Sequence, residues 1–306
     1  MVTLAAALAF AGGIDLGRRH DGSHAAAASL KPAARTHPSR HVQSRHAAAR
    51  PLIVAAPAPR HAFVPRLTGS SAILVDAVSG RVLWAFRPHA RRLVASTTKI
   101  MTAVLALDRL GPQDVVTVAR TVPRVPLVKE GLRPGERVRA WKLFYGLLLF
   151  SGNDDALALA IASAGSRAEF VAQMNLEARH LGLRDTHYAG PSGVIDQNNY
   201  SSAWDLAALT RYAMRNPRFR AIVRTQRKEV SWSPPTFAKL YLNKNLMLST
   251  FRGADGVKTG WTTIAKHCLV ASAHRHGIHL IAVVIGSPDA YRDVRRLLNY
   301  GFARRG

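Results

Sequence analysis

The sequence predicts an α+β fold, in which an antiparallel sheet is flanked by helices and a helical lobe is inserted in the middle of the chain. Three observations lead to this prediction. Apolar segments of strand type stand near both ends of the region from residue 68 onward, amphipathic segments of helix type fill its middle, and no internal repeat is visible. Strands at both ends with helices between them indicate one mixed domain.

The first predicted elements are a hairpin and a helix. The segments 71–78 and 81–86 are apolar and flank Ser79-Gly80, a pattern typical of two strands joined by a tight turn. From residue 97 to 110 apolar side chains recur at roughly helical intervals, and Gly111-Pro112 ends that run.

The later elements follow from the same periodicities. Helices are expected at 141–150 and 154–165, separated by Ser151-Gly152-Asn153, and again at 169–183, 202–216 and 289–302. The segment 266–287 has the pattern of a strand, a turn at His276-Gly277 and a second strand.

The N-terminal region differs in composition from the rest of the chain. Residues 1–14 form an apolar leader that resembles part of a secretion signal and is too short for an ordinary membrane span, although no Lys or Arg precedes the apolar stretch. Residues 15–67 are rich in Ala, Arg, His and Pro without sustained periodicity, which predicts a disordered tether. Residues 68–306 are therefore expected to form the folded domain.

The chain of 306 residues carries a formal net charge of +25. The tether holds nine Arg or Lys residues against two Asp, so most of the excess belongs to the domain. Such a charge predicts an anionic neighbour, which could be nucleic acid, a membrane surface or an acidic wall polymer. No zinc-finger spacing, RNP-like string or basic zipper favours nucleic acid.

Cysteine and histidine usage gives little support for metal chemistry. The single cysteine, Cys268, excludes an internal disulfide and fits a small buried side chain. The thirteen histidines include six at irregular spacing in the tether and three around a predicted turn, His274, His276 and His279, and no H-E-x-x-H string occurs. No metal and no cofactor is expected.

Residues suited to catalysis fall in three short strings. In chain order they are Ser96-Thr97-Thr98-Lys99, Ser151-Gly152-Asn153 and Lys258-Thr259-Gly260. The motifs S-x-x-K, S-D-N and K-T-G together are the signature of penicillin-binding proteins and class A β-lactamases. Taken alone, Ser96 has the position of a plain helix N-cap, and Asn153 could equally be an ordinary cap.

The first string suits nucleophilic catalysis. Residues three apart on a helix share a face, so the Lys99 amine can reach the Ser96 hydroxyl. A serine hydroxyl needs a base, and a lysine can be that base when burial and a nearby cation, here Lys258, lower its pKa. The backbone N–H of Ser96, in the first helical turn, can stabilise an oxyanion.

The other two strings suit substrate binding and proton transfer. Ser151 would relay a proton to the leaving nitrogen, and Asn153 would donate a hydrogen bond to a substrate amide. Lys258 and Thr259 would hold a terminal carboxylate. Gly260 would let a strand run close to the substrate, and the N–H of the next residue, Trp261, would be the second oxyanion donor.

The context of these strings resembles the low-molecular-weight D-alanyl-D-alanine carboxypeptidases, the serine penicillin-binding peptidases. The similarity covers about residues 70–302 and includes SAILVDAVSGRVLWAF, ASTTKIMTAVLAL, LRPGERV, LLLFSGNDDALALA, GPSGVIDQNNYSSAWDLA, GADGVKTGWT, HCLVASA and LLNYGF. It implies the DD-peptidase/β-lactamase fold, an extracytoplasmic location and removal of the terminal D-Ala of peptidoglycan stem peptides through an acyl-serine. Penicillin and other β-lactams should then acylate Ser96.

The sequence departs from the family pattern at several points. Val94 stands where the family usually has proline before the first motif, and the chain ends at Gly306, without the second domain and C-terminal anchor of larger members. Members often use an arginine after the K-T-G strand for the substrate carboxylate, and Arg292 is the candidate here.

Four alternatives remain open to different degrees. A class A β-lactamase would have S-D-N and an E-x-x-L-N string, and no glutamate in this chain is followed four residues later by asparagine. A D,D-endopeptidase that cleaves cross-links would use the same residues. A non-catalytic wall-binding module would keep the fold alone, and a nucleic-acid binder rests only on the charge.

Overall fold

The computed structural model describes residues 52–53, 65–194, 198–232 and 237–304. The predicted leader over residues 1–14 lies outside the described residues, as does most of the predicted tether over residues 15–67. Within that stretch residues 52–53 and 65–67 are described. Ile53 is 7% exposed and belongs to the main apolar core, and the carbonyl of Leu52 accepts a hydrogen bond of 2.8 Å from Arg211 Nη1.

A five-stranded sheet in the order β2-β1-β9-β8-β7 lies at the centre of the body, and every neighbouring pair in it is antiparallel. Its strands are β1 (Ser71–Asp76), β2 (Val82–Phe86), β7 (Ala254–Thr262), β8 (Lys266–Arg275) and β9 (Ile278–Ser287). Side chains of a strand alternate between the two faces of a sheet. Accordingly, Val270 and Val283 belong to one core cluster, and their neighbours Leu269 and Val284 to another.

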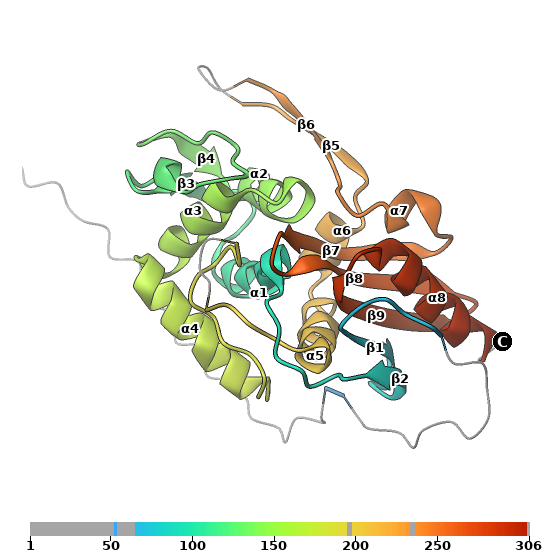
Figure 1. The fold of residues 1–306 in the computed structure, drawn as a ribbon. Coiled ribbons are helices and arrows are strands. Elements are labelled where there is room, and N and C mark those ends of the chain that lie inside the picture. Colours follow the sequence, from blue (N-terminus) through green and yellow to red (C-terminus); the bar gives the residue numbers. More distant parts are fainter. Residues whose placement is uncertain (1–51, 54–64, 195–197, 233–236, 305–306) are drawn as a thin grey trace, which may run out of the picture. The chain divides into compact units, whose positions relative to one another are not determined.

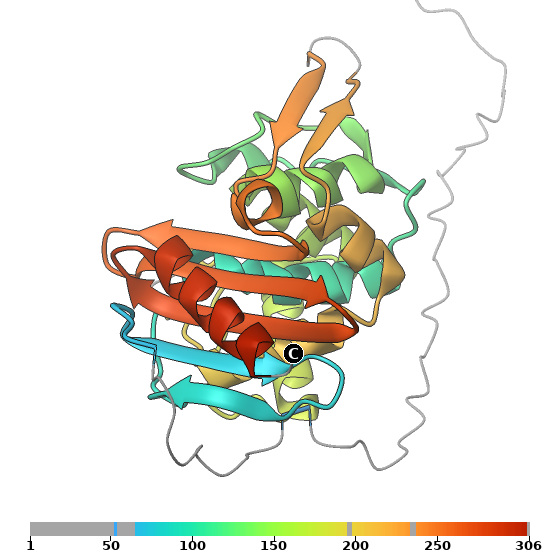
Figure 2. The ribbon, with the colours of Figure 1, turned by 90° about the vertical axis from the view of Figure 1, so that its right-hand side faces the viewer.

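Helices cover both faces of this sheet. The C-terminal helix α8 (Ala290–Ala303) packs against β8 and β9 on one face, as Figure 2 shows. On the other face lie α5 (Ala203–Ala213), which contacts β1 and β9, and α1 (Lys99–Arg109), which packs against α5. Helix α1 is buried along nearly its whole length because its apolar residues are surrounded by helices of both the sheet layer and the lobe.

The helical lobe is inserted between β2 and α5 in the chain. It consists of α2 (Ala140–Tyr145), a π-helical turn η3 (Gly146–Phe150), α3 (Asn153–Ala164) and α4 (Arg167–His180). Short strands β3 (Val115–Thr117) and β4 (Arg137–Arg139) pair at its outer side, and a single turn η2 (Val122–Arg124) lies between them in the chain. The predicted combination of an antiparallel sheet, flanking helices and an inserted helical lobe is confirmed.

The segment between α5 and β7 contains elements that the sequence patterns did not predict. Helix α6 (Pro217–Val223) is followed by an antiparallel hairpin of β5 (Arg227–Val230) and β6 (Lys239–Leu242), and then by α7 (Met247–Thr250). The hairpin projects from the body beside the lobe (Figure 1). Its strands are only four residues long, with the sequences Arg-Lys-Glu-Val and Lys-Leu-Tyr-Leu, so no regular alternation of apolar and polar side chains marks them.

The predicted elements are otherwise found close to their expected positions. The hairpin of β1 and β2, the helix beginning near residue 97, the two helices on either side of residues 151–152, and the strand–turn–strand of β8 and β9 are all present. Cys268 is buried as expected, and burial raises the pKa of its thiol to about 11. None of the described helices is long and apolar enough to cross a membrane.

Candidate active site

Ser96 lies in a 3₁₀ turn, η1 (Ala95–Thr98), that leads directly into α1. Lys99 is the first residue of α1, and its side chain is completely buried. Its Nζ lies 3.0 Å from Ser96 Oγ and donates to Asn153 Oδ1 at 2.8 Å and to the carbonyl of Ser192 at 3.0 Å. The helical spacing therefore brings the serine hydroxyl and the lysine amine into hydrogen-bond contact.

The surroundings of Lys99 favour its uncharged form. Burial lowers the pKa of Lys99 well below its ordinary value, and the nearby cation of Lys258 lowers it further. The carboxyl groups of Asp155 and Asp154 act in the opposite direction, and Lys244 adds to the lowering. An uncharged lysine amine can act as a general base.

The S-G-N string forms the turn between η3 and α3. Ser151 has a left-handed backbone (φ 73°), and its N–H donates to the carbonyl of Gly146 at 2.8 Å. Asn153 begins α3, and its Nδ2 donates to the carbonyl of Pro126 at 3.1 Å while its N–H donates to the carbonyl of Val128 at 2.8 Å. The side-chain amide of Asn153 is thus fixed between Lys99 and the loop of residues 125–136, which connects η2 to β4.

The K-T-G string lies on β7, which forms one edge of the main sheet. A Cβ atom on Gly260 would lie 2.8 Å from the carbonyl oxygen of Val94 and 3.1 Å from the backbone nitrogen of Ser96. Only a glycine lets β7 run this close to the turn that carries Ser96. The structure therefore brings the first and third strings side by side.

Lys258 is 1% exposed, and its Nζ donates to the carbonyl of Thr259 at 3.0 Å. Burial first, and the charge of Lys244 second, lower the pKa of Lys258 to about 7. Thr259 is half-buried, and the indole of Trp261 is 57% exposed. Both residues follow Lys258 on the same edge strand.

Arg292 does not join this group in the part of the chain that the structure describes. It lies in the first turn of α8, on the sheet face opposite α1, and its Nε is 3.6 Å from Asp289 Oδ2. Its backbone N–H also donates to Asp289, to Oδ1 at 3.0 Å. Its role in carboxylate binding stays a prediction.

The sequence patterns missed the contribution of the 190–193 segment. The carbonyl of Ser192 accepts from Lys99, and the carbonyl of Pro191 accepts from Thr102 Oγ1 at 2.6 Å. A Cβ on Gly193 (φ 74°) would lie 2.1 Å from the carbonyl oxygen of Ala95. The G-P-S-G string at 190–193 marks this segment in the sequence. Its residue types do not indicate that a backbone carbonyl would accept a hydrogen bond from Lys99.

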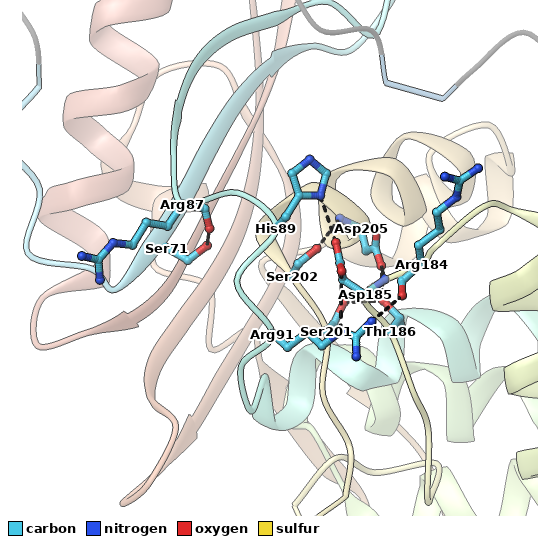
Figure 3. Close-up of polar contacts among 10 residues, drawn as sticks. All are labelled: Ser71, Arg87, His89, Arg91, Arg184, Asp185, Thr186, Ser201, Ser202 and Asp205. Carbon is cyan, nitrogen blue, oxygen red and sulfur yellow. Dashed lines mark hydrogen bonds and ion pairs between the residues drawn. The ribbon is translucent and has the colours of Figure 1, made fainter.

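A polar network holds the two segments that lead to Ser96 and to Ser192 (Figure 3). His89 Nδ1 lies 2.9 Å from Asp185 Oδ2, and Arg91 Nε lies 3.6 Å from the other oxygen of that carboxylate. Asp205, in the first turn of α5, accepts from Asp185 N and Thr186 Oγ1, both at 2.7 Å. These bonds fix the segment 87–92 against 184–187, so both approaches to Lys99 are anchored at α5.

The histidines near the β8–β9 turn have structural contacts. His279 Nε2 lies 2.8 Å from Ser272 Oγ and 3.2 Å from Asp255 Oδ2, and the rings of His274 and His279 meet edge to face. Among the described residues no group of three or more His, Cys, Asp or Glu could hold a metal ion.

Comparison with known proteins agrees with this geometry. The sequence profile of peptidase family S11, D-alanyl-D-alanine carboxypeptidase, matches residues 58–289. The D-alanyl-D-alanine carboxypeptidase DacF of Bacillus subtilis (strain 168) is 33% identical over 76% of this chain, which spans 62% of that relative. The D-alanyl-D-alanine carboxypeptidase of Streptomyces sp. (strain K15) is 36% identical over 74% of this chain and 84% of its own length.

Solved structures give the same result. The crystal structure of the Streptomyces K15 DD-transpeptidase superposes with a TM-score of 0.74 at 32% identity, covering 79% of this chain and 100% of that one. The fold is therefore that of the DD-peptidases. The chain belongs to the D-alanyl-D-alanine carboxypeptidase family of serine peptidases, peptidase family S11.

Proposed function

We propose that the chain is a serine D,D-carboxypeptidase that removes the terminal D-Ala from peptidoglycan stem peptides. The observation that carries the proposal is the environment of the Lys99 amine. An uncharged amine has two N–H groups and one lone pair, and Asn153 Oδ1 and the Ser192 carbonyl can only accept. Both hydrogens are therefore used, and the lone pair is left for the hydroxyl of Ser96 at 3.0 Å.

Acylation follows from this arrangement. Ser96 Oγ attacks the carbonyl carbon of the penultimate D-Ala while Lys99 Nζ takes the hydroxyl proton. The negative charge that develops on the carbonyl oxygen is stabilised by the backbone N–H groups of Ser96 and Trp261. Lys258 and Thr259 hold the terminal carboxylate, and the second N–H of Asn153 Nδ2 is directed to a substrate amide.

The leaving group and the second half-reaction use the same residues. The proton on Lys99 passes through Ser151 to the nitrogen of the departing D-Ala, so the peptide bond breaks and an ester to Ser96 remains. Water then attacks this ester, Lys99 takes a proton from the water, and Ser96 recovers its hydroxyl. The products are free D-Ala and a stem peptide shortened by one residue.

The test is the substitution Ser96→Ala. It is expected to abolish both covalent labelling by fluorescent penicillin and release of D-Ala, because the variant lacks the hydroxyl that lies against the Lys99 amine. Labelling that persisted in this variant would refute the role of Ser96. Absence of labelling in the unsubstituted protein would favour a non-catalytic wall-binding module instead.

A second candidate reaction is transpeptidation, because the Streptomyces K15 protein with the same fold is a DD-transpeptidase. The acyl-serine would then be transferred to an amine of a neighbouring stem peptide instead of water. A D,D-endopeptidase would cleave such a cross-link. Mass analysis of wall fragments before and after incubation separates the three reactions, since trimmed monomers, new cross-links and cleaved cross-links differ in mass.

The proposed substrate implies that the protein acts outside the cytoplasm, and an export signal in the leader would suit that location. β-Lactams are the expected acylating inhibitors. The net charge of +25 supports attraction to anionic wall polymers or to the membrane surface, and nucleic acid is not expected as a partner.

A further inference from the structure

Asp154 follows Asn153 in α3, and its carboxyl group is completely buried behind the site. Its Oδ1 accepts from the backbone N–H of Glu130 at 2.8 Å, and its Oδ2 accepts from the N–H groups of Gly131 at 2.9 Å and Leu132 at 3.2 Å. A carboxylate that accepts several backbone N–H bonds binds that backbone strongly. One side chain thus fixes three successive residues of the loop that connects η2 to β4, residues 125–136.

The same loop supplies the carbonyl groups that orient Asn153. Its residues Pro126 and Val128 accept hydrogen bonds from Nδ2 and from the N–H of Asn153. Asn153 Oδ1 in turn accepts from Lys99 Nζ at 2.8 Å. The described contacts form a continuous path from Asp154 through the loop and Asn153 to Lys99.

The outer side of this loop is held separately by the hairpin of β5 and β6. Glu130 Oε2 accepts from Lys239 Nζ at 2.6 Å and from Tyr241 Oη at 2.7 Å. The loop is therefore clamped between Asp154 on the inside and the hairpin on the outside. The side chains of Leu127 and Val128 are 65% and 39% exposed, so this stretch of the loop is held by polar contacts, whereas Leu132 is buried in the main apolar core.

We propose that Asp154 is a positioning residue of the active site. By holding the backbone of residues 130–132 it fixes the loop and Asn153, and so keeps the Lys99 amine within hydrogen-bond distance of Ser96. Asp154 itself touches neither the substrate nor the reacting atoms. The expected loss of acylation rate rests on the proposed function, whereas the expected position of the Lys99 amine rests on the structure alone.

The experiment compares Asp154→Asn with Asp293→Asn. Asp293 is an equally buried carboxylate that accepts from backbone N–H groups, those of Thr68 and Gly69, both at 2.9 Å, but it lies on α8 across the sheet. An asparagine keeps the shape and removes the charge in both places. At residue 154 both oxygens accept N–H groups, so the NH₂ group would face a donor, whereas at residue 293 only Oδ2 accepts hydrogen bonds from the described residues. Asp293→Asn therefore controls for the loss of a buried carboxylate charge at a distance from the site.

The expected result is specific to Asp154→Asn. The rate constant for acylation falls by about tenfold or more, because a base displaced by a fraction of an ångström loses its alignment, while KM changes little. Asp293→Asn lowers the unfolding midpoint and leaves acylation unchanged. Equal losses of acylation in the two variants, or no loss in Asp154→Asn, would overturn the proposal.

A measurement that does not depend on activity is the titration of Lys99 by NMR of ¹³Cε-labelled lysine. The charged groups around Lys99 are Lys258 on β7, Lys244 before α7, and Asp155 and Asp154 on α3. Since Asp154 raises the pKa of Lys99, Asp154→Asn should lower that pKa and shift the ascending limb of the acylation profile to lower pH. Loss of the charge alone would lower this pKa, so the position of the Lys99 amine is tested by the variants at Gly131 and Gly135 below, which leave the charge unchanged.

A second pair of variants covers the case in which Asp154→Asn does not fold. Gly131 (φ 88°) and Gly135 (φ 77°) both have left-handed backbones, and a Cβ atom at either position would meet open space. An alanine strains the backbone equally at either position, but only Gly131 donates to Asp154. Gly131→Ala should alter the Lys99 titration and Gly135→Ala should not; equal behaviour of the two would overturn the proposal.

Discussion

Gly152, the middle residue of the S-G-N turn, lies directly against the carboxyl group of Asp155. A Cβ at residue 152 would be 2.0 Å from Asp155 Oδ2, and one at Gly146 would be 2.5 Å from the same atom. Burial, and then the charges of Glu130 and Asp154, raise the pKa of Asp155 well above its ordinary value. The carboxyl group of Asp155 therefore fills the space that the aspartate side chain of an S-D-N motif would need.

This contact predicts a strong coupling between two substitutions. Gly152→Ala should lower the free energy of unfolding by about 1–3 kcal/mol through overpacking, since the backbone there (φ −61°) accepts any residue. Adding Asp155→Ala should restore part of that loss because it removes the clashing oxygen. Urea denaturation of the two single variants and the double variant measures the coupling, and simple additivity would refute the clash.

Lys258 leads to a prediction about pH. Its pKa of about 7 means that its positive charge is present below pH 7 and lost as the pH rises through that value. The proposed binding of a terminal carboxylate requires that charge. The quotient kcat/KM for a peptide ending in D-Ala-D-Ala should therefore fall above about pH 7.

The control is the same peptide with its terminal carboxylate amidated. Its kcat/KM should be low throughout and lack this descending limb, because there is no carboxylate for Lys258 to attract. Lys258→Ala should likewise remove the limb and weaken binding of the acid form. A descending limb of equal size for the acid and the amide would exclude this role for Lys258.

At the scale of elements, three strands of the main sheet are joined by side chains at the end where β8 and β9 meet. Asp255 on β7 is bound by Ser272 on β8 and by His279 on β9. Burial would raise the pKa of Asp255, but the hydrogen bonds from His279 and Ser272 outweigh it and lower that pKa. The carboxylate therefore stabilises the fold above its unfolded pKa, and this contribution is lost as the pH falls through the lower folded value.

The prediction for this cluster is a pH-dependent loss of stability. Asp255→Asn should lower the free energy of unfolding by about 1 kcal/mol at pH 7 and by much less at pH 3, where the native carboxyl group is becoming protonated. Urea denaturation at the two pH values measures the difference. A loss of equal size at both would show that the charge of Asp255 does not matter.

The sequence predicted the elements whose apolar periodicity is long and uninterrupted. Helix α1 and the strands β8 and β9 were found because ten or more residues repeat one pattern and a glycine turn bounds them. The hairpin of β5 and β6 was not, because its strands have four residues each and expose Leu240 and Leu242. Short exposed strands depend on tertiary contacts, which a local pattern does not contain.

The active site was predictable to the extent that its side chains belong to short strings. Ser96 and Lys99 are three residues apart on one helical turn, so their contact follows from local geometry. The carbonyl of Ser192 and the loop held by Asp154 come from segments far away in the chain, and backbone atoms leave no residue-type signal. Their contribution to the site is visible only in three dimensions.

At the scale of the whole molecule, three arginines gather at one corner of the sheet. The guanidinium of Arg275 lies 4.1 Å from the ring centroid of Phe251 and 4.8 Å from that of Phe302, and that of Arg295 lies 5.7 Å from Phe251. Arg252 is adjacent, since its carbonyl accepts from Arg275 Nε at 2.7 Å. Their positive charge is therefore concentrated around an aromatic surface.

If the proposed attraction to anionic wall polymers is correct, these three arginines should contribute more to polymer binding than three arginines elsewhere on the surface. Changing Arg252, Arg275 and Arg295 to Gln should weaken retention on immobilised poly(glycerol phosphate) more than the same change at three arginines of the lobe side, Arg120, Arg137 and Arg179. Retention of the unsubstituted protein should also fall as salt is raised. Equal effects of the two triple variants would mean that the attraction is spread over the whole surface, and salt-independent retention would exclude it.

The close approach of β7 at Gly260 also limits how such an enzyme could escape a drug. Selection by a β-lactam favours replacements near the active site that hinder the antibiotic more than the natural peptide. A methyl group at residue 260 would collide with the carbonyl of Val94 and the amide of Ser96, and so would disable turnover together with inhibition. Single substitutions that give resistance are therefore expected at other positions near Ser96 and not at residue 260.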